Sequence, residues 1–392
     1  MVASITKPIS RISTDYPSEI NLILHVVRLN LSEQDCSYIK ELLQATIDWS
    51  LFFQTATQQG ILPLICWNLK QLFSNRLPTN VLEYVNSSLQ QNTHHNLLLT
   101  RELCRLLKRF DDQNLAVLPF KGPVLAQSVY KNISLRQISD LDFLFYDEDF
   151  ETAKNLLLAD GYQPKIEVPW ETHLVRKDSI YNLDLHNLIA PQHLSHPLTN
   201  QDVWQHTQPL SLAGQTITSL TPEMTLIMLC LHGTKEHWRH LNRICDVAAL
   251  VECSTLDWDK VITLTQGWGY QRLVSLGLTL AQNLLGAELP EIATQWMVKD
   301  VIALTELENI VNQQLFQMSI TPVGEVERSR FHMRTRERWS DKLKTFIGLM
   351  NHSGWLTLTP ADKAYWDLPA AFSFMYYFLR PIRILQKYKE QL

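Results

Sequence analysis

The chain has 392 residues, more than the roughly 250–300 that one hydrophobic core usually supports, so we expect several structural units. Hydrophobic residues make up 45% of the chain and charged residues 19%, which is typical of an ordinary globular protein. The formal net charge is −5, which gives no overall attraction to a polyanion. We therefore expect a small molecule or a protein as partner rather than long nucleic acid.

The sequence carries no signal for export or for a membrane span. Residues 1–7 lack the apolar core of a secretory signal, and no apolar run reaches the roughly 18 residues of a spanning helix. The six cysteines form no C-x-x-C pair, so we expect reduced thiols and a cytoplasmic location. The short apolar stretch 368–379 predicts a buried helix, although the basic residues after it leave an interfacial membrane helix as the alternative.

Hydrophobic spacing divides the chain into four regions. Apolar residues at helical spacing predict an N-terminal helical region over 1–112. The period changes in 113–200, where strands and helices alternate: a strand over 115–121, a helix over 124–131, a strand around 141–145, a helix over 149–160 and two or three strands over 163–189. We expect helices again in 201–320 and in a C-terminal region, 321–392, with an exposed arginine-rich segment. The fold class is therefore α+β, with a small sheet flanked by helical regions.

Two carboxylates in the second predicted strand are the most informative feature. Asp140 and Asp142 alternate with Leu141, Phe143 and Phe145, so the two acids share one face of a half-buried strand. Neighbouring carboxylates repel each other unless a cation lies between them. A divalent metal with oxygen ligands, Mg²⁺ or Mn²⁺, would keep both ionised and carry substrate phosphates.

A third acid, Asp184, lies in a later alternating strand, on the same face as His186. If this strand lies beside the first, three carboxylates surround one or two metals, which is the arrangement required for in-line displacement at phosphorus. The alternative is that the acids are surface residues that neighbour one another by chance.

Phosphate-binding residues are expected around these acids. Lys121 and Gly122 end the first predicted strand where a helix begins, a place that suits an anion, and Arg136 could clamp a triphosphate. Further along, the polar residues His232, Lys235 and Arg239 are expected on one helix face, and Arg243 and Asp246 on the next helix, where they could simply pair. Trp238 could stack on a base, although a core position is the commoner case.

These residues together resemble the uncharacterised nucleotidyltransferase family, which belongs to the DNA-polymerase-β-like superfamily. The resemblance is carried by Leu118-Pro119-Phe120-Lys121-Gly122, Tyr130, Arg136, Ser139-Asp140-Leu141-Asp142, Gly161-Tyr162, Leu183-Asp184-Leu185-His186, His232-Gly233-Thr234-Lys235, Arg243, Asp246-Val247-Ala248, Leu368-Pro369 and Arg380-Pro381. It implies a small mixed polymerase-β-like sheet that transfers a nucleoside monophosphate from an NTP. It also implies that Asp140 and Asp142 bind metal, that Asp184 is the third carboxylate, and that Ser139 belongs to the nucleotide site.

The sequence departs from the superfamily at one position. Members usually have Ser or Gly after the glycine that follows the first strand, whereas Gly122 precedes Pro123 here. The triphosphate would then be held differently, by Lys121, Arg136 or the region around Lys235.

We therefore expect a Mg²⁺- or Mn²⁺-dependent enzyme that transfers AMP from ATP, or another nucleotide, to a hydroxyl of a small molecule, peptide or protein. One alternative is a non-catalytic nucleotide- or partner-binding module. The other is a glycosyltransferase that uses its D-x-D motif, but such enzymes carry alternating strands and helices before the motif, where this chain is helical.

Overall fold

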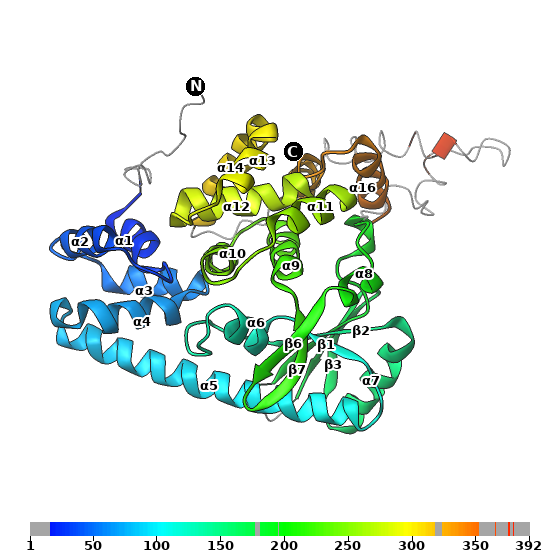
Figure 1. Ribbon diagram of the computed structural model, residues 1–392, viewed down its shortest axis with the longest axis horizontal. Coiled ribbons are helices and arrows are strands. Elements are labelled where there is room, and N and C mark those ends of the chain that lie inside the picture. Colours follow the sequence, from blue (N-terminus) through cyan, green and yellow to red (C-terminus); the bar gives the residue numbers. More distant parts are fainter. Residues whose placement is uncertain are drawn as a thin grey trace.

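The computed structural model describes residues 16–176, 181–194, 196–317 and 324–352, together with residues 365, 375, 376 and 379. The late motifs Leu368-Pro369 and Arg380-Pro381 lie outside the described residues. Over the described residues the protein is α+β, with a small mixed sheet and helices on both sides of it (Figure 1). The sequence-based fold class is confirmed at this level.

The N-terminal region is helical, as its spacing predicts. Its last helix, α5, is the longest and runs beneath the rest of the molecule in Figure 1. The elements are α1 (Ser18–Val26), α2 (Glu33–Leu42), α3 (Trp49–Gln58), α4 (Leu62–Phe73), the 3₁₀ helix η1 (Ser74–Arg76) and α5 (Thr79–Asp111).

The sheet has five strands in the order β1-β2-β5-β4-β3. Strands β2 and β5 are parallel, and the other neighbours are antiparallel. The bounds are β1 (Val117–Pro119), β2 (Leu141–Phe145), β3 (Gln163–Val168), β4 (Glu171–Val175) and β5 (Asn182–His186). Two helices connect the strands, α6 (Gly122–Ser128) and α7 (Asp147–Ala159). The predicted strand–helix order of this region is confirmed.

One face of the sheet is closed by a hydrophobic core. Leu103, Leu106 and Phe110 of α5 pack there against Phe143 and Phe145 of β2, and residues of α7 complete the cluster. Phe110 meets Phe143 and Phe145 edge-on, with ring centroids 5.6 and 5.2 Å apart. Because side chains alternate along a strand, this packing turns Asp142 to the opposite face.

A β-hairpin follows where the sequence predicts only helix. Strands β6 (Thr207–Leu212) and β7 (Gln215–Leu220) pair antiparallel, and their turn residues Ala213 and Gly214 have φ of +49° and +78°. Leu212 and Ile217 belong to the core beneath the sheet, so the hairpin extends the α/β unit. The expectation of an entirely helical 201–320 region is therefore wrong over these residues.

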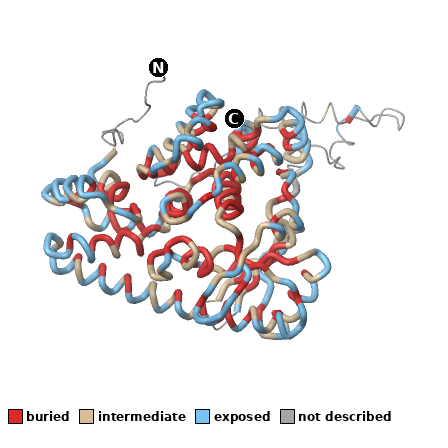
Figure 2. Tube along the Cα trace, viewed as in Figure 1, coloured by how far each residue is buried: buried red, intermediate tan, exposed pale blue. Residues whose placement is uncertain are grey.

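The remaining helices pack with the N-terminal helices around a second, larger core, where buried residues concentrate (Figure 2). Helix α9 starts as its sequence predicts: Thr221 caps it, and Pro222 and Glu223 occupy its first turn. The elements are the 3₁₀ helix η2 (Gln192–Leu194), α8 (Asn200–Trp204), α9 (Pro222–Lys235), α10 (Leu241–Cys253), α11 (Trp258–Trp268), α12 (Gln271–Leu285), α13 (Glu291–Met297), the 3₁₀ helix η3 (Val298–Asp300), α14 (Val301–Leu315), α15 (Glu325–Arg334) and α16 (Trp339–His352).

No described helix is both long enough and apolar enough to cross a membrane. All six cysteines are unpaired thiols.

Candidate functional site

The site begins with the register between two parallel strands. Asp142 of β2 lies directly opposite Asp184 of β5, and His186 follows two residues later on the same face. Ligand atoms of Asp142, Asp184 and His186 all lie within 4.8 Å of one another. Two of the three predicted acids are thus brought together, and a histidine joins them.

Asp142 is buried, with 4% of its surface exposed, and is held by two basic groups. Lys121 donates a hydrogen bond from Nζ to Oδ1 at 2.7 Å, and Nε2 of His186 lies 3.2 Å from the same oxygen. Burial alone would raise the pKa of Asp142, but the Lys121 ammonium and His186 outweigh burial and lower it. The carboxylate is therefore ionised, while its second oxygen, Oδ2, is buried without a hydrogen-bond partner.

The pKa values of Asp184 and Asp140 are shifted in the opposite direction from that of Asp142. Burial, and then the charge of Asp142, raise the pKa of both carboxyl groups. Asp184 contacts Nδ1 of His173 on β4, which lies opposite it in the sheet. Asp140 precedes β2 and accepts a hydrogen bond from Ser139 Oγ at 3.0 Å. The charges of Asp142 and Asp184 thus raise the pKa of Asp140, but its carboxylate lies outside the close group of ligand atoms.

A second group of charges connects the sheet to helix α9. Nδ1 of His186 lies 3.6 Å from Glu171 of β4, and the same Glu171 oxygen lies 3.6 Å from Nζ of Lys235. His186 therefore bridges Asp142 and Glu171, and its position depends on both carboxylates.

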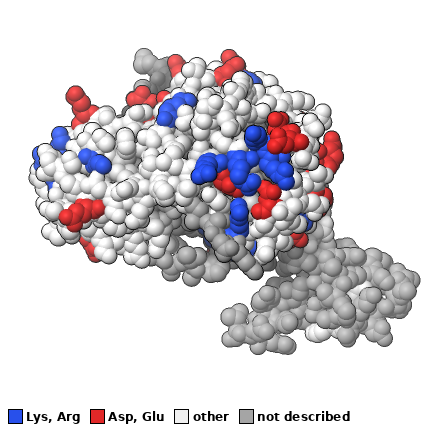
Figure 3. Space-filling model, turned by 90° about the horizontal axis from the view of Figure 1, so that it is seen from below, with Lys and Arg blue, Asp and Glu red and all other residues white. Residues whose placement is uncertain are grey.

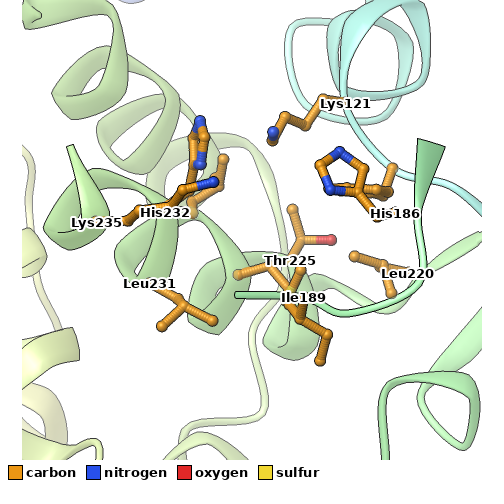
Figure 4. Close-up of a pocket in the computed structure, with 11 residues that line it drawn as sticks. Lys121, His186, Ile189, Leu220, Thr225, Leu231, His232 and Lys235 are labelled. Atoms are coloured by element: carbon orange, nitrogen blue, oxygen red, sulfur yellow. The ribbon is translucent and has the colours of Figure 1, made fainter. Parts of the chain in front are cut away.

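A pocket opens beside these residues, between the sheet edge and α9. Lys121 and His186 lie across it from His232 and Lys235 (Figure 4). Its remaining lining is apolar apart from Thr225: Phe120, Ile189, Leu220, Met228, Leu229 and Leu231. Burial, and then the positive charges of Lys121 and Arg243, lower the pKa of His232 to about 3, so its ring is neutral at neutral pH. The pocket combines an apolar lining with two ammonium groups.

The turn that places Lys121 depends on a glycine. Gly122 has φ of +49°, a conformation that L side chains rarely adopt, and a Cβ there would lie 3.0 Å from the carbonyl oxygen of Asp140. Gly122 therefore lets the β1–α6 turn approach the strand that carries the acids. Whether its backbone also binds phosphate stays a prediction.

Arg136 and Asp246, both predicted to bind the nucleotide, form an ion pair with each other. The Arg136 guanidinium donates two hydrogen bonds to Asp246, at 3.0 and 3.1 Å, and the Tyr130 hydroxyl donates a third at 2.8 Å. Asp246 is fully buried and Arg136 is 8% exposed. The guanidinium predicted to clamp a triphosphate is thus engaged in a buried ion pair between the α/β unit and α10.

Arg243 makes a different contact from the expected pair with Asp246. Its guanidinium donates to Glu236 at 2.8 and 3.2 Å, because Asp246 is taken by Arg136. Glu236 also lies 3.0 Å from Nε2 of His232. Arg243 therefore sits behind His232 and fixes the surroundings of the pocket.

In the segment after α9, the expected position of Arg239 is wrong and the favoured core position of Trp238 is confirmed. Helix α9 ends at Lys235, and His237 and Trp238 then have φ of +60° and +54°, so Arg239 does not continue the face of His232 and Lys235. Trp238 is completely buried, and Gly233 leaves the space that its ring fills. Its position is in the core, where it cannot stack on a bound base.

His173 and Glu171 are site residues that the sequence analysis did not name. Strand alternation placed His186 on the face of Asp184, but the sequence analysis gave His186 no role in the site. His173 and Glu171 had no such signal, because the register of β4 against β5 cannot be read from spacing.

The donor set fits a divalent metal. Two carboxylates and an imidazole converge, and the buried Oδ2 of Asp142 lacks a partner, which a metal ion would supply. The ammonium of Lys121 neutralises the same carboxylate through its other oxygen.

Comparison with known proteins agrees with this arrangement. The model of a family described as uncharacterised nucleotidyltransferase matches residues 45–286, which is more than half of the chain and includes every acid of the site. No curated protein and no solved structure gave a significant match. With its paired strand carboxylates and a match of this extent, the chain belongs to the uncharacterised nucleotidyltransferase family.

Proposed function

We propose that the chain is a Mg²⁺- or Mn²⁺-dependent nucleotidyltransferase with a polymerase-β-like core. It transfers a nucleoside monophosphate, AMP from ATP foremost, to a hydroxyl or similar group of a small molecule, peptide or protein. The observation that supports this most is the convergence of Asp142, Asp184 and His186 beside a pocket with two lysines. We assign the chemistry to the 113–200 core and nucleotide contacts to its junction with the 201–320 region.

The residues take distinct roles in this proposal. Asp142 and Asp184, with His186 and the nearby Asp140, would hold the metal, which would supply positive charge to neutralise the phosphates. Asp184 also accepts the proton of the acceptor hydroxyl. The hydroxyl oxygen then bonds to the α-phosphorus, and pyrophosphate leaves.

Lys121 and Lys235 provide positive charge for the triphosphate, and the apolar lining between them accepts the base or sugar. Gly122, Ser139, His232 and Arg243 shape the surroundings of that site. We propose a structural role for Arg136 and Asp246, since each already satisfies the other's charge.

The acceptor is proposed to be small or peptidic rather than long nucleic acid. On the face shown in Figure 3, basic and acidic side chains lie next to one another, without a separate basic track. Ion pairs on α5 are of this kind: Arg105 contacts Glu102 at 2.7 Å and Asp160 at 2.9 Å. Such mixed charge gives little attraction to a polyanion.

The second candidate is a non-catalytic nucleotide- or partner-binding module. It is favoured by one observation, since Lys121 and His186 already neutralise Asp142 without a metal. A glycosyltransferase is disfavoured, because helices α1–α5 fill the described chain before β1.

The test is incubation of labelled ATP, GTP, CTP or UTP with cell extract, Mg²⁺ and the protein, followed by mass spectrometry of the labelled product. We expect a product whose mass increases by one nucleoside monophosphate, together with pyrophosphate release. The Asp142→Asn variant should form none, and Glu148→Gln on the exposed start of α7 should behave as the parent. Nucleotide binding without any transferred label would favour the module.

A further inference from the structure

Helix α16 is amphipathic, but its polar side faces the protein and its apolar side faces solvent. The side that faces the protein carries Asp341 and Thr345, which are 7% and 0% exposed, and Gly348. The side that faces solvent carries large apolar residues: Trp339 is 83% exposed, Leu343 59%, Phe346 49% and Ile347 45%. Surface helices of globular proteins show the reverse arrangement, with the apolar stripe against the core.

The orientation of α16 is fixed by close contacts on its polar side. Thr345 donates a hydrogen bond from Oγ1 to the carbonyl oxygen of Leu194 at 3.3 Å. At Gly348 a Cβ would lie 2.2 Å from the carbonyl oxygen of His193, so only glycine allows this approach. Rotation of the helix to bury its apolar side would break both contacts.

The exposed apolar side is bordered by positive charge. Nζ of Lys342 lies 5.3 Å from the centroid of the Trp339 ring, and Lys344 is exposed. The one carboxylate within α16, Asp341, belongs to the buried side. This face therefore presents tryptophan, phenylalanine and leucine beside lysines, and α16 itself adds no exposed acid to it, although the chain as a whole carries a net charge of −5.

The size of the exposed apolar face of α16 argues against a second protein copy as the partner that covers it. Four partly exposed side chains on one 14-residue helix supply only part of the roughly 800 Å² per partner that a stable dimer buries. A lipid surface makes no such demand, because apolar side chains partition into the boundary between headgroups and acyl chains one by one. Lysines beside them are attracted to anionic headgroups.

We propose that α16 docks the protein on an anionic lipid surface, with Trp339, Leu343, Phe346 and Ile347 inserted and Lys342 and Lys344 at the headgroups. The helix lies in the plane of the surface, and the protein remains peripheral, in agreement with the absence of a spanning helix among the described residues. The sequence after α16 has a similar composition, with the apolar stretch 368–379 followed by Arg380, Arg383, Lys387 and Lys389. This inference is independent of the proposed enzymatic activity.

The test is co-sedimentation of the full chain with vesicles of phosphatidylcholine alone or with about 30% phosphatidylglycerol. We expect binding to the anionic vesicles, weaker binding to the neutral ones, and loss of binding at high salt. The combined variant Leu343→Ser and Phe346→Ser should bind at least about tenfold more weakly, since two inserted side chains are lost. The matched control is Ile302→Ser on α14, another exposed apolar residue at 77%, which should bind as the parent.

Circular dichroism and the thermal unfolding midpoint should be the same for parent and variants, because the substituted side chains are exposed. Three results would overturn the proposal. The first is no preference for anionic vesicles, and the second is equal binding by the combined variant. The third is a dimer in solution that the combined variant converts to monomer, which would assign the face to a second copy.

Discussion

Asp142 holds its charge in a buried position because the chain supplies its own cation. Lys121 reaches it from the end of β1, and His186 reaches it from the neighbouring strand. Among the described residues no lysine or arginine forms an ion pair with Asp184 or Asp140, and burial raises the pKa of each instead. Three nearby carboxyl groups thus differ in proton affinity, which separates a fixed anion from groups that can take up a proton.

These differences predict how metal binding changes with pH. A metal competes with protons for its carboxylate ligands, and a raised pKa moves that competition to higher pH. We expect Mn²⁺ affinity to begin falling at a pH above the ordinary carboxyl pKa of about 4, measured by electron paramagnetic resonance of free Mn²⁺. An affinity that falls only at or below that ordinary value would contradict the raised pKa values of Asp140 and Asp184.

The buried pair of Arg136 and Asp246 gives a second prediction. Arg136→Met leaves the Asp246 charge buried with only the Tyr130 hydroxyl, and should lower the free energy of unfolding by about 3–5 kcal/mol. The double variant with Asp246→Leu removes both charges and should recover a large part of this loss, as urea unfolding will measure. If Arg136→Met instead weakens only nucleotide binding and leaves stability unchanged, Arg136 is a ligand residue.

At this scale the sequence predicts the acids better than their partners. Strand alternation places Asp140 with Asp142 and Asp184 with His186, and the parallel register of β2 and β5 then brings Asp142 beside Asp184. The partner of Arg136 could not be predicted, because it lies on an element far away in sequence, and Arg243 pairs with Glu236 across the irregular segment that follows α9. Arg136 pairs across 110 residues, and a spacing rule within one helix cannot detect such a contact.

Among the elements, the β1–α6 turn positions Lys121 for its contact with Asp142. Gly122→Ala would place a Cβ 3.0 Å from the Asp140 carbonyl oxygen in a backbone conformation with φ of +49°. We expect a loss of about 1–3 kcal/mol in unfolding free energy and a lower nucleotide affinity, because the turn shifts with Lys121. Gly214 in the β6–β7 turn also has positive φ but has open space around it. Gly214→Ala is therefore the matched control for the cost of placing alanine in this backbone conformation. Equal effects on nucleotide affinity would show that the turn does not position the site.

The β6–β7 hairpin shows why one element was missed. Its strands contain polar residues at most positions and only Leu212, Ile217 and Leu220 are buried apolar, so hydrophobic alternation is weak. The turn residues Ala213 and Gly214 both have positive φ, as in a tight hairpin, but Ala-Gly is not one of the pairs that predict such a turn from sequence. By contrast, strands β2 and β5 and helix α9 have strong periodicity or capping residues, and their predictions are confirmed.

On the scale of the whole molecule, buried histidines connect the end of α9 to the C-terminal helices. Nε2 of His237 lies 3.2 Å from Nε2 of His332, and both rings are largely buried. Burial is the main cause that lowers the pKa of His237 to about 4 and that of His332 to about 3. The ordinary pKa of histidine in an unfolded chain is about 6.5.

The sign of the resulting pH dependence follows from proton linkage. Below about pH 6.5 the unfolded chain binds protons that the folded chain excludes, so stability is full above that pH and falls as the pH drops towards 4. For one such histidine the loss at about pH 5 is about 2 kcal/mol. His332→Gln should therefore reduce the stability difference between pH 7 and pH 5, measured by urea unfolding at both values. His94→Gln, an exposed histidine on α5, should leave the difference unchanged, and an equal effect of both variants would contradict this reading.

The most direct test of the proposed site is Mn²⁺ binding to the parent chain and to the variants Asp142→Asn, Asp184→Asn and Glu148→Gln, measured at neutral pH by calorimetry. Convergence of Asp142 and Asp184 on one ion predicts that each of the first two substitutions removes most of the binding, while Glu148→Gln leaves it unchanged. Undiminished Mn²⁺ binding by folded Asp142→Asn and Asp184→Asn proteins would show that these carboxylates hold no metal, and would contradict the proposed nucleotidyl transfer.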